Sequence, residues 1–345
     1  MRIAYFVSSL KKTGPVVVVY ELTSQMVRRG NDVIVYYFDD ADSNFLDFPC
    51  ETKKISFKEK IDFSKYDVVH SHNFRPDLFI FIHKPIKKTK TKFITTLHNF
   101  VLNDFITDYG KIKGVLLGNL WMMIVKRHNM RVVLSNVAKD YYRKWFKETQ
   151  MTVIYNTRSI PQGLTLSNDE QKELLDFKKD PILLGINAIL TPIKGVDIIL
   201  RALSSLPNIK LYIVGDGKSK EDLQQQAINL GVNERVFFAG YRDNAFRYLP
   251  FYDLYMMPSR SEGFPLALLE AVALKCNVVV SDIPIFKEIF NDKEVTFFKM
   301  EDVESLVEAI NYSLTHNKSE KAYEKYMKDY APNNFGDAYL SLYNA

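Results

Sequence analysis

Short runs of β-branched and apolar residues alternate with helical stretches along nearly the whole chain, and this alternation constrains the fold more than any other feature. In the first half, the predicted strands are residues 2–8, 32–38, 67–70, 93–97, 131–134 and 152–154. The first predicted helix, residues 16–29, stops at Gly30, a residue typical of helix ends. A repeating strand–helix–strand order predicts a parallel sheet with helices on both faces.

A second series of the same kind follows polar residues 161–180, which we interpret as a linker. Its predicted strands are residues 182–186, 209–214, 236–239, 254–257 and 278–281, and its predicted helices are 196–206, 221–230, 266–274 and a group from 303 onward. We expect an α/β protein with two Rossmann-like, doubly wound domains at 1–165 and 166–325. A C-terminal helix, 326–345, with an aromatic face is expected to pack back on the first domain. Ligands of such domains bind in a cleft at the carboxyl ends of the strands.

The composition is that of an ordinary globular protein, with 47% hydrophobic and 25% charged residues. Cys50 and Cys276 lie far apart, so we expect neither a disulfide framework nor a cysteine metal site. The chain does not open with a leader-like segment, and its longest apolar run, 115–125, is shorter than the ~20 residues that span a bilayer. These features favour a cytoplasmic protein.

Residues 252–288 carry the most informative chemistry: a strand, a polar loop and a helix that begins near Pro265. The start of a helix offers unpaired N–H groups and a partial positive charge, which suit a phosphate. Glu262 precedes this helix and Glu270 lies on it. Their carboxylates can accept hydrogen bonds from the hydroxyls of two separate parts of a ligand.

This segment resembles a known family. The run SEGFPLALLEA, residues 261–271, is similar to the signature of family 4 glycosyltransferases, in which seven residues separate two glutamates. Other motifs follow in the order of that family: YDVVHSHN (66–73), TTLHNF (95–100), KGVDIILRAL (194–203), LYIVGDG (211–217) and VFFAGY (236–241). The resemblance covers nearly the whole chain and implies the GT-B fold, in which two Rossmann-like domains face a central cleft.

The resemblance also implies an activity. A retaining enzyme would move a hexose or an N-acetylhexosamine from a nucleoside diphosphate sugar, with UDP preferred, without a metal or other cofactor. Its partner substrate would be a saccharide acceptor, lipid-linked, in the synthesis of O-antigen, lipopolysaccharide or capsule.

The same resemblance assigns roles to single residues. Glu262 and His98 would be catalytic, with Glu262 on the donor sugar and His98 in the cleft near donor and acceptor. Glu270 would bind the ribose hydroxyls, and Lys194 would neutralise the diphosphate as it leaves. Further donor-binding positions, which would act through the backbone, are Gly14, Gly240, Gly263, Phe264 and Leu266.

Several positions depart from the family pattern. The arginine that usually precedes the Lys–Gly pair is missing, and Ala188 and Ile189 stand in its place. Arg260 and Lys218 are two candidates to replace that cation. The remaining departures are single-glycine or glycine-free turns at Thr13–Gly14–Pro15, Asn156–Thr157 and Ile283–Pro284.

Other interpretations stay open at this point. His98 also fits a structural histidine that is satisfied within the protein. His70 and His72 lack partners with metal-ligand spacing, and Asp40 and Asp42 lie in an acidic turn, so we predict no metal site. The GDG turn lacks the third glycine of a dinucleotide fingerprint, which argues against a dehydrogenase. A nucleotide-sugar epimerase, a phosphorylase and a non-catalytic GT-B-like partner subunit are the alternatives to a transferase.

The net charge is +5, and the excess of lysine and arginine lies in the first half of the chain. Residues 111–131 combine an apolar centre with basic flanks, and five lysines lie between Lys84 and Lys92. This pattern fits peripheral contact with an anionic membrane at its inner face, and equally a core helix with a solvated basic end. We expect no nucleic-acid partner, because no stacking platform or recognition motif accompanies the charge.

Overall fold

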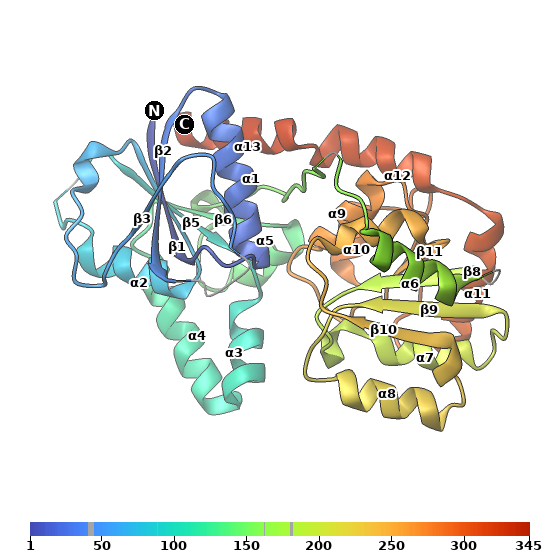
Figure 1. The fold of residues 1–345 in the computed structure, drawn as a ribbon. Coiled ribbons are helices and arrows are strands. Elements are labelled where there is room, and N and C mark those ends of the chain that lie inside the picture. The colour runs from blue at the N-terminus through green and yellow to red at the C-terminus, as the bar shows by residue number, and fades with distance from the viewer. Residues whose placement is uncertain (41–44, 88, 162, 180–181) are drawn as a thin grey trace. The chain divides into compact units, whose positions relative to one another are not determined.

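The computed structural model describes residues 1–40, 45–87, 89–161, 163–179 and 182–345 (Figure 1). Asp42, Lys88 and the end of the expected linker, Asp180, lie outside the described residues. The chain forms two compact units of similar size. Unit 1 comprises Met1–Arg158 with Tyr330–Ala345, and unit 2 comprises Ser159–Asp329.

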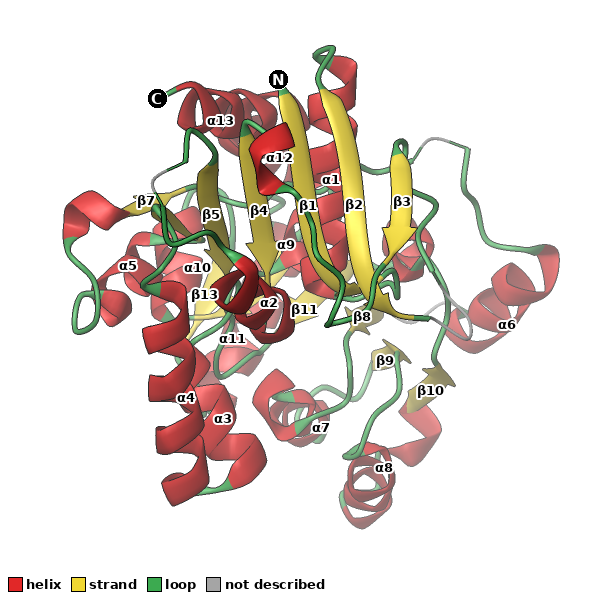
Figure 2. Ribbon diagram, turned by 90° about the vertical axis from the view of Figure 1, so that its left-hand side faces the viewer, coloured by secondary structure: helices red, strands yellow, loops and turns green. Residues whose placement is uncertain are grey.

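Unit 1 is built on a seven-stranded sheet in the order β3-β2-β1-β4-β5-β6-β7 (Figure 2). All of its strand pairs are parallel. The strands are β1 (Arg2–Ser9), β2 (Asp32–Asp39), β3 (Glu51–Lys54), β4 (Val68–His72), β5 (Lys92–Leu97), β6 (Met130–Val133) and β7 (Met151–Val153). The inner strands are buried on both faces, as in any sheet that helices cover on both sides.

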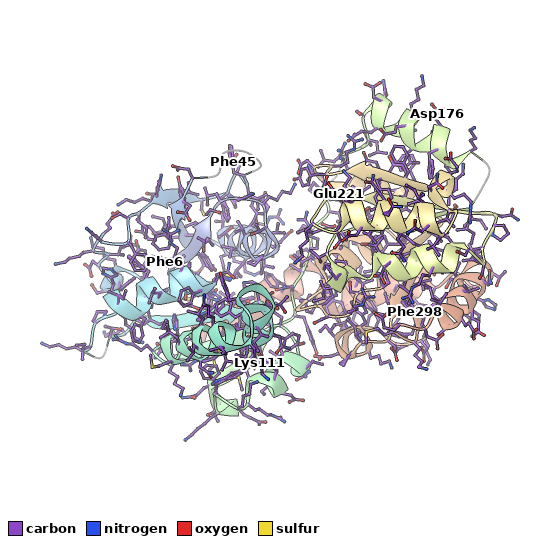
Figure 3. The ribbon with its side chains drawn as sticks, turned by 90° about the horizontal axis from the view of Figure 1, so that it is seen from below. Phe6, Phe45, Lys111, Asp176, Glu221 and Phe298 are labelled. Carbon is purple, nitrogen blue, oxygen red and sulfur yellow. The ribbon has the colours of Figure 1, made fainter. Side chains whose placement is uncertain are left out.

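Helices α1 (Gly14–Arg28), α2 (Phe74–His83), α3 (Val101–Tyr109), α4 (Lys111–Val125), α5 (Asn136–Tyr142) and α13 (Pro332–Asn344) complete unit 1. Helix α13, from the far end of the chain, packs against α1. Gly336 allows this contact, because a Cβ there would lie 2.6 Å from the Arg29 guanidinium. Phe6, labelled in Figure 3, is fully buried in a cluster of aromatic side chains between the sheet and α2.

Unit 2 has a six-stranded parallel sheet in the order β10-β9-β8-β11-β12-β13. Its strands are β8 (Ile182–Asn187), β9 (Ile209–Val214), β10 (Val236–Gly240), β11 (Leu254–Met257), β12 (Val278–Ser281) and β13 (Thr296–Phe298). Its helices are α6 (Asn168–Lys178), α7 (Val196–Leu203), α8 (Lys220–Asn229), α9 (Leu266–Ala273), α10 (Pro284–Ile289), α11 (Val303–Thr315) and α12 (Ser319–Lys325). The predicted class, two doubly wound α/β domains, is confirmed.

One local prediction was wrong, and another was incomplete. The expected linker contains α6, whose first turn is closed by a capping box: Ser167 accepts from the Glu170 N–H, and Glu170 accepts from the Ser167 N–H. The expected C-terminal helix, 326–345, begins as a short π-helical turn, Tyr326–Tyr330, and continues as α13. Pro332 opens α13, and a proline suits the first turn of a new helix but not the interior of a continuing one.

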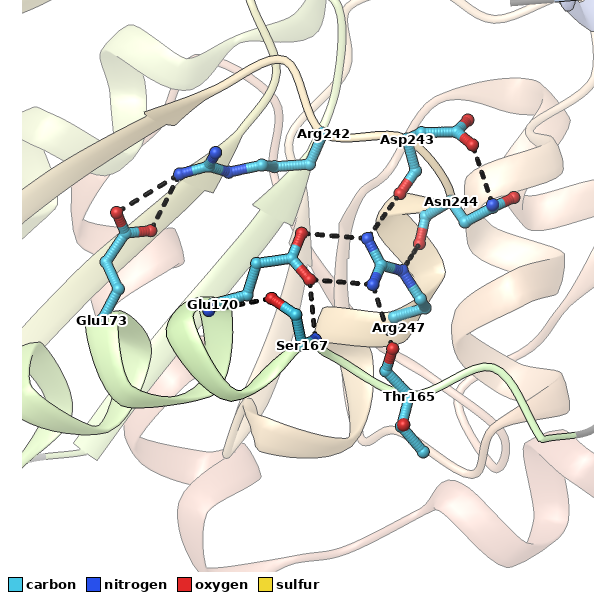
Figure 4. A network of polar contacts seen from close by, with 8 residues as sticks. All are labelled: Thr165, Ser167, Glu170, Glu173, Arg242, Asp243, Asn244 and Arg247. Atoms are coloured by element: carbon cyan, nitrogen blue, oxygen red, sulfur yellow. Dashed lines mark hydrogen bonds and ion pairs between the residues drawn. The ribbon is translucent and has the colours of Figure 1, made fainter.

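The capping box belongs to a polar network that fastens α6 to the segment after β10 (Figure 4). Arg247 makes two hydrogen bonds to the Glu170 carboxylate, at 2.8 and 3.0 Å, and Arg242 contacts Glu173. Burial opposes ionisation of Glu170, but Arg247 and the Ser167 N–H outweigh it and lower the pKa of this carboxyl to about 2. The network therefore fixes the chain just beyond Gly240.

Candidate functional site

Several loops meet at the carboxyl edge of the unit 2 sheet, where the α/β architecture places ligands. The loop after β8 ends in a short 3-10 helix, Pro192–Lys194, and the loop after β11 runs from Pro258 to Pro265. The Arg260 N–H donates to the Ile193 carbonyl at 2.8 Å, so the two loops are joined through their backbones.

Lys194 and Glu262 meet across this junction. The Lys194 Nζ atom lies 2.7 Å from Glu262 Oε1, and the Ser259 hydroxyl donates to the same oxygen at 2.7 Å. Ser259 is itself held, because the Ser281 hydroxyl at the end of β12 donates to its carbonyl. The Lys194 side chain is 25% exposed and that of Glu262 is 9% exposed, so the pair is reachable but partly screened from water.

Gly195 makes the approach of the two loops possible. Its φ of +68° is left-handed, and a Cβ there would lie 2.1 Å from the Pro258 carbonyl oxygen, closer than atoms pack. The Lys–Gly pair of the sequence therefore has a physical basis: the lysine reaches the carboxylate only because its neighbour has no side chain.

A glycine-to-alanine comparison tests this role. Gly195→Ala is expected to destabilise unit 2 by about 3 kcal/mol or more, because left-handed strain adds to a backbone clash. Gly231 is the matched control: its φ is +67°, but nothing lies within 4 Å of its Cβ position. Gly231→Ala is expected to cost only about 1 kcal/mol of strain. Urea unfolding of both variants measures the difference, and equal losses would contradict the close approach.

Arg260 is engaged within the protein. Its guanidinium donates to both carboxylate oxygens of Asp197 at 2.8 Å, to Glu301 and to the Pro192 carbonyl. This arrangement clamps the β11–α9 loop onto the start of α7. The hypothesis that Arg260 supplies the missing diphosphate cation is therefore disfavoured, whereas Lys218, in the turn after β9, is exposed.

The GDG turn after β9 packs against the loop where the family arginine is missing. Cβ atoms at Gly215 and Gly217 would meet the carbonyls of Ala188 and Leu190 at 1.8 and 2.4 Å. The Leu190 N–H also donates to the Asp216 carbonyl. Ile189, between them, is 70% exposed. An apolar side chain thus stands exposed beside the candidate site, in the position of the expected cation.

The other residues expected to hold a donor in unit 2 lie around the same edge. Glu270 is half-buried on α9. Burial raises the pKa of the Tyr255 hydroxyl, and the negative charges of Glu270 and Glu262 raise this pKa further. Both carboxylates therefore act on the same buried tyrosine. Gly240 ends β10 with a φ of +72°, and its carbonyl accepts from the Gly215 N–H at 2.8 Å.

Three further predicted residues stand at the start of α9. Gly263 and Phe264 precede the helix, and the Phe264 side chain is buried. Leu266 is the first helical residue. Its N–H donates to the Phe264 carbonyl at 3.1 Å, so this N–H already has an acceptor within the protein. The first turn of α9 contains no acidic residue, which leaves its partial positive charge uncompensated locally.

Unit 1 contains the remaining two predicted residues. Gly14 is exposed, begins α1, and does not have a positive φ. His98 follows β5 and is 8% exposed. Its Nε2 atom lies 2.9 Å from Nδ1 of His72, the last residue of the neighbouring strand β4. Burial lowers the pKa of His98 to about 3, so its ring is neutral at neutral pH.

Sequence reasoning missed the buried polar networks behind these residues. His70 Nδ1 lies 2.7 Å from the Tyr343 hydroxyl of α13, and His70 Nε2 lies 2.9 Å from Thr96 Oγ1. The signal was present as the pair of histidines in a strand and the tyrosine spacing near the C-terminus, but only the fold brings them together. A second network joins Ser71, Asp77, Trp121 and His128, all fully or nearly fully buried.

Across the described residues, no group of three or more His, Cys, Asp or Glu side chains is arranged to hold a metal ion. Among those residues, no helix is both long and apolar enough to cross a membrane.

Comparison with known proteins identifies the class. Residues 13–158 match the family described as Glycosyltransferase Family 4, and residues 167–330 match Glycosyl transferases group 1. The structure of Anabaena HepE in complex with UDP and glucose superimposes with a TM-score of 0.81 at 16% identity, over 99% of each chain. Fold and sequence thus define a glycosyltransferase with the GT-B fold.

Similarity to individual glycosyltransferases defines the family within this class. The chain is 31% identical over 352 aligned positions to the O-antigen biosynthesis glycosyltransferase WclY of Escherichia coli, covering 100% of this chain and 98% of the relative. It is 24% identical to the UDP-Gal:alpha-D-GlcNAc-diphosphoundecaprenol alpha-1,3-galactosyltransferase of Escherichia coli, over 74% of this chain and 68% of that enzyme. The chain belongs to the group 1/family 4 glycosyltransferases.

Proposed function

We propose that the protein transfers a hexose or an N-acetylhexosamine from a UDP-sugar to a lipid-linked saccharide, with retention of anomeric configuration, in the synthesis of O-antigen or a related surface polysaccharide. The observation that carries this proposal is the Lys194–Glu262 pair beside the start of α9. It sets a cation, a carboxylate and a helix N-terminus side by side, as a sugar joined to a diphosphate requires.

The chemistry follows from charge. As the bond from the anomeric carbon to the diphosphate breaks, negative charge grows on the phosphate oxygens and positive charge on the sugar. Lys194 and the partial positive charge at the start of α9 stabilise the negative charge, and Glu262 stabilises the positive charge. The acceptor hydroxyl attacks the anomeric carbon on the face that the diphosphate leaves, and its proton passes to the leaving phosphate oxygen. Glu270 binds the ribose, and the backbone at Gly240 holds the base.

The relatives support the biological setting. WclY is named for O-antigen biosynthesis, and the galactosyltransferase relative takes UDP-Gal as donor and a diphosphoundecaprenol-linked acceptor, as its name states. The HepE structure contains UDP and glucose. Together they favour UDP over other nucleotides and a lipid-linked acceptor over a free sugar.

A thermal-shift panel of UDP, GDP, ADP and CMP tests the donor class. UDP at one hundred times its Kd is expected to raise the melting temperature by roughly 5–10 °C, with or without EDTA. The shift is expected to vanish in Glu270→Ala, because that variant loses the ribose contact. A shift with GDP alone would replace UDP in the proposal. No shift with any nucleotide in folded protein would favour a non-catalytic subunit.

Helix α4 supplies a surface for the membrane that carries such an acceptor. One face packs on α3 through Gly114 and Gly118, where a Cβ would lie 2.5 and 2.9 Å from α3 atoms. The apolar side chains on its open side are exposed: Ile112 (78%), Leu116 (67%), Leu120 (41%) and Met123 (53%). A core helix would bury this second face.

The charges around α4 fit an anionic lipid surface. Lys111, labelled in Figure 3, and Lys113 and Lys126 are exposed, and no acidic residue occurs between 111 and 131. We therefore propose that the open face of α4 lies on an anionic bilayer, with the lysines at the headgroups.

Vesicle flotation tests this surface. Wild-type protein is expected to float with vesicles that contain phosphatidylglycerol, and to bind less as salt rises. The double variant Ile112→Glu, Leu116→Glu is expected to lose most of its vesicle binding, since two charges replace the inserted side chains. Ile228→Glu, at an exposed apolar position on α8, is the matched control and is expected to float normally. Flotation of the double variant at the wild-type level would exclude α4 as the binding face.

A further inference from the structure

His72 and His98 share one hydrogen bond, and the tautomers of the two rings determine which one donates it. The His72 Nδ1 and His98 Nε2 atoms are 2.9 Å apart, and the rings lie 5.2 Å apart between centroids. Both rings are buried, and burial lowers the pKa of each. Each neutral ring therefore has one N–H and one bare nitrogen.

Two arrangements satisfy this contact. In one, His72 Nδ1–H donates to His98 Nε2, and the second nitrogen of His72 is bare. In the other, His98 Nε2–H donates to His72 Nδ1, and the proton of His72 sits on its Nε2 atom. The His72 Nε2 atom is enclosed and has no hydrogen-bond partner within the described part of the chain. The arrangements therefore differ in what they bury: a lone pair in the first, an N–H in the second.

A buried N–H without an acceptor is the rarer and costlier of the two. The Nδ1 atom of His98 differs from the Nε2 atom of His72. The His98 side chain is partly exposed, and its Nδ1 atom does not belong to the set of enclosed atoms without a hydrogen-bond partner. A proton on His98 Nδ1 can thus be solvated, whereas one on His72 Nε2 cannot.

The surroundings hold His72 in place. Its ring lies against that of His70, at 4.4 Å between centroids, and near Tyr5. His70 is fixed by Thr96 and by Tyr343 of α13. His72 therefore cannot turn easily to move its Nδ1 atom away from His98.

We propose that His72 is a positioning residue that holds His98 as a neutral Nδ1–H tautomer, so that His98 donates a hydrogen bond to a sugar hydroxyl and does not act as a base. The tautomer follows from unit 1 alone, and only the sugar hydroxyl rests on the proposed function.

Nitrogen-15 NMR of the ring nitrogens in the full-length protein tests the tautomer directly. At pH 7.5, the His98 signals, assigned by their loss in His98→Ala, are expected to show a protonated Nδ1 and a bare Nε2. A protonated Nε2, a charged ring, or an average closer to the Nε2–H form would overturn the proposal. This measurement needs no substrate, so it stands whether or not transfer is observed.

Paired variants test the consequence for turnover. His98→Asn keeps a donor near the Nδ1 position and is expected to retain transfer within about tenfold of wild type. His98→Gln carries its amide near the Nε2 position and is expected to lose about a hundredfold. The opposite order would overturn the donor role. If even wild type transfers no sugar, the proposed function fails and the tautomer result is unaffected.

Variants at His72 separate positioning from packing. His72→Leu is expected to lower kcat about tenfold with little change in KM, and to leave His98 in a mixture of tautomers. His72→Asn keeps a donor toward His98 and is expected to restore the Nδ1–H form and most of the rate. A His98 tautomer unchanged in His72→Leu would show that His72 does not set it.

Discussion

Glu262→Gln is expected to lower the rate of sugar transfer by about 10²–10³-fold while the enzyme still binds the nucleoside diphosphate. The amide fills the same space and can still accept from Ser259, so the loop between β11 and α9 keeps its shape. In the proposed mechanism, the substitution removes the negative charge that stabilises the anomeric carbon. Glu262 also pairs with Lys194. Without that partner, Lys194 is free to meet the diphosphate.

Glu262→Gln is therefore expected to slow sugar transfer without weakening the binding of the nucleoside diphosphate. A partly exposed ion pair is worth up to about 1 kcal/mol, so affinity for the bare nucleoside diphosphate is expected to stay the same or to rise a few-fold in Glu262→Gln. Lys194→Met should weaken that affinity by about tenfold or more, because a charge-assisted hydrogen bond to phosphate is lost. Calorimetry of the nucleotide and initial rates of transfer measure the two effects separately.

Another lysine–glutamate pair serves as the control. Lys275 and Glu320 are 3.0 Å apart in the same unit, but exposed and away from the loop at Gly195. Glu320→Gln is expected to change neither binding nor transfer. If Glu262→Gln bound nucleotide much more weakly, or transferred sugar at the wild-type rate, Glu262 would not have the role given to it here.

The fold was predictable because its signals are local. Each buried strand is a short β-branched run, and helix ends are marked by residues such as Gly30 and Pro265. The failures were local as well. The edge strand β3, with four exposed residues, has no apolar pattern, and the capping box at Ser167 was overlooked because the segment around it is polar. Polar composition alone does not distinguish a linker from a surface helix.

The candidate site was predictable only in part. Lys194 and Glu262 stand in recognisable motifs, and both lie where two loops meet. The clamp of Arg260 on Asp197 could not be predicted, because it depends on the approach of segments 63 positions apart. The same limit applies to His72, whose contact with His98 arises from the parallel pairing of β4 and β5. Motifs reveal which residues carry chemistry, but the fold determines what each one is bonded to.

The buried histidines of unit 1 lead to the second large effect, a steep loss of stability in mild acid. Burial is the largest cause that lowers the pKa of four histidines: His70, His72, His98 and His128. For His98 and His128 the value falls to about 3. Below pH 6.5 these histidines bind protons in the unfolded chain but stay neutral in the folded protein. Their stabilising contribution is therefore complete above pH 6.5 and is lost as pH falls.

Asp77 acts in the opposite direction. Burial raises the pKa of its carboxyl from 3.8 to about 6, so the folded protein takes up this proton first, and stability returns as pH falls through 6. The four histidines favour unfolding in acid and Asp77 alone opposes it, so unit 1 is expected to lose stability steeply as pH falls from about 6 to 4. Because domains are stable by only about 5–15 kcal/mol, unit 1 is expected to unfold between about pH 4 and pH 5.5.

Tryptophan fluorescence isolates this transition, because Trp121 and Trp145 are the only tryptophans in the sequence and both lie in unit 1. Urea unfolding at pH 7.5, 6.5 and 5.5 is expected to show a midpoint that falls sharply over the last step. His128→Gln keeps a donor toward Ser71 but removes one titrating ring, so the urea midpoint of this variant is expected to fall less steeply with pH than that of wild type. His316→Gln, in unit 2, should leave the fluorescence transition unchanged. A urea midpoint that stays constant from pH 7.5 to pH 5.5 would mean that these histidines are protonated as readily in the folded chain as in the unfolded one.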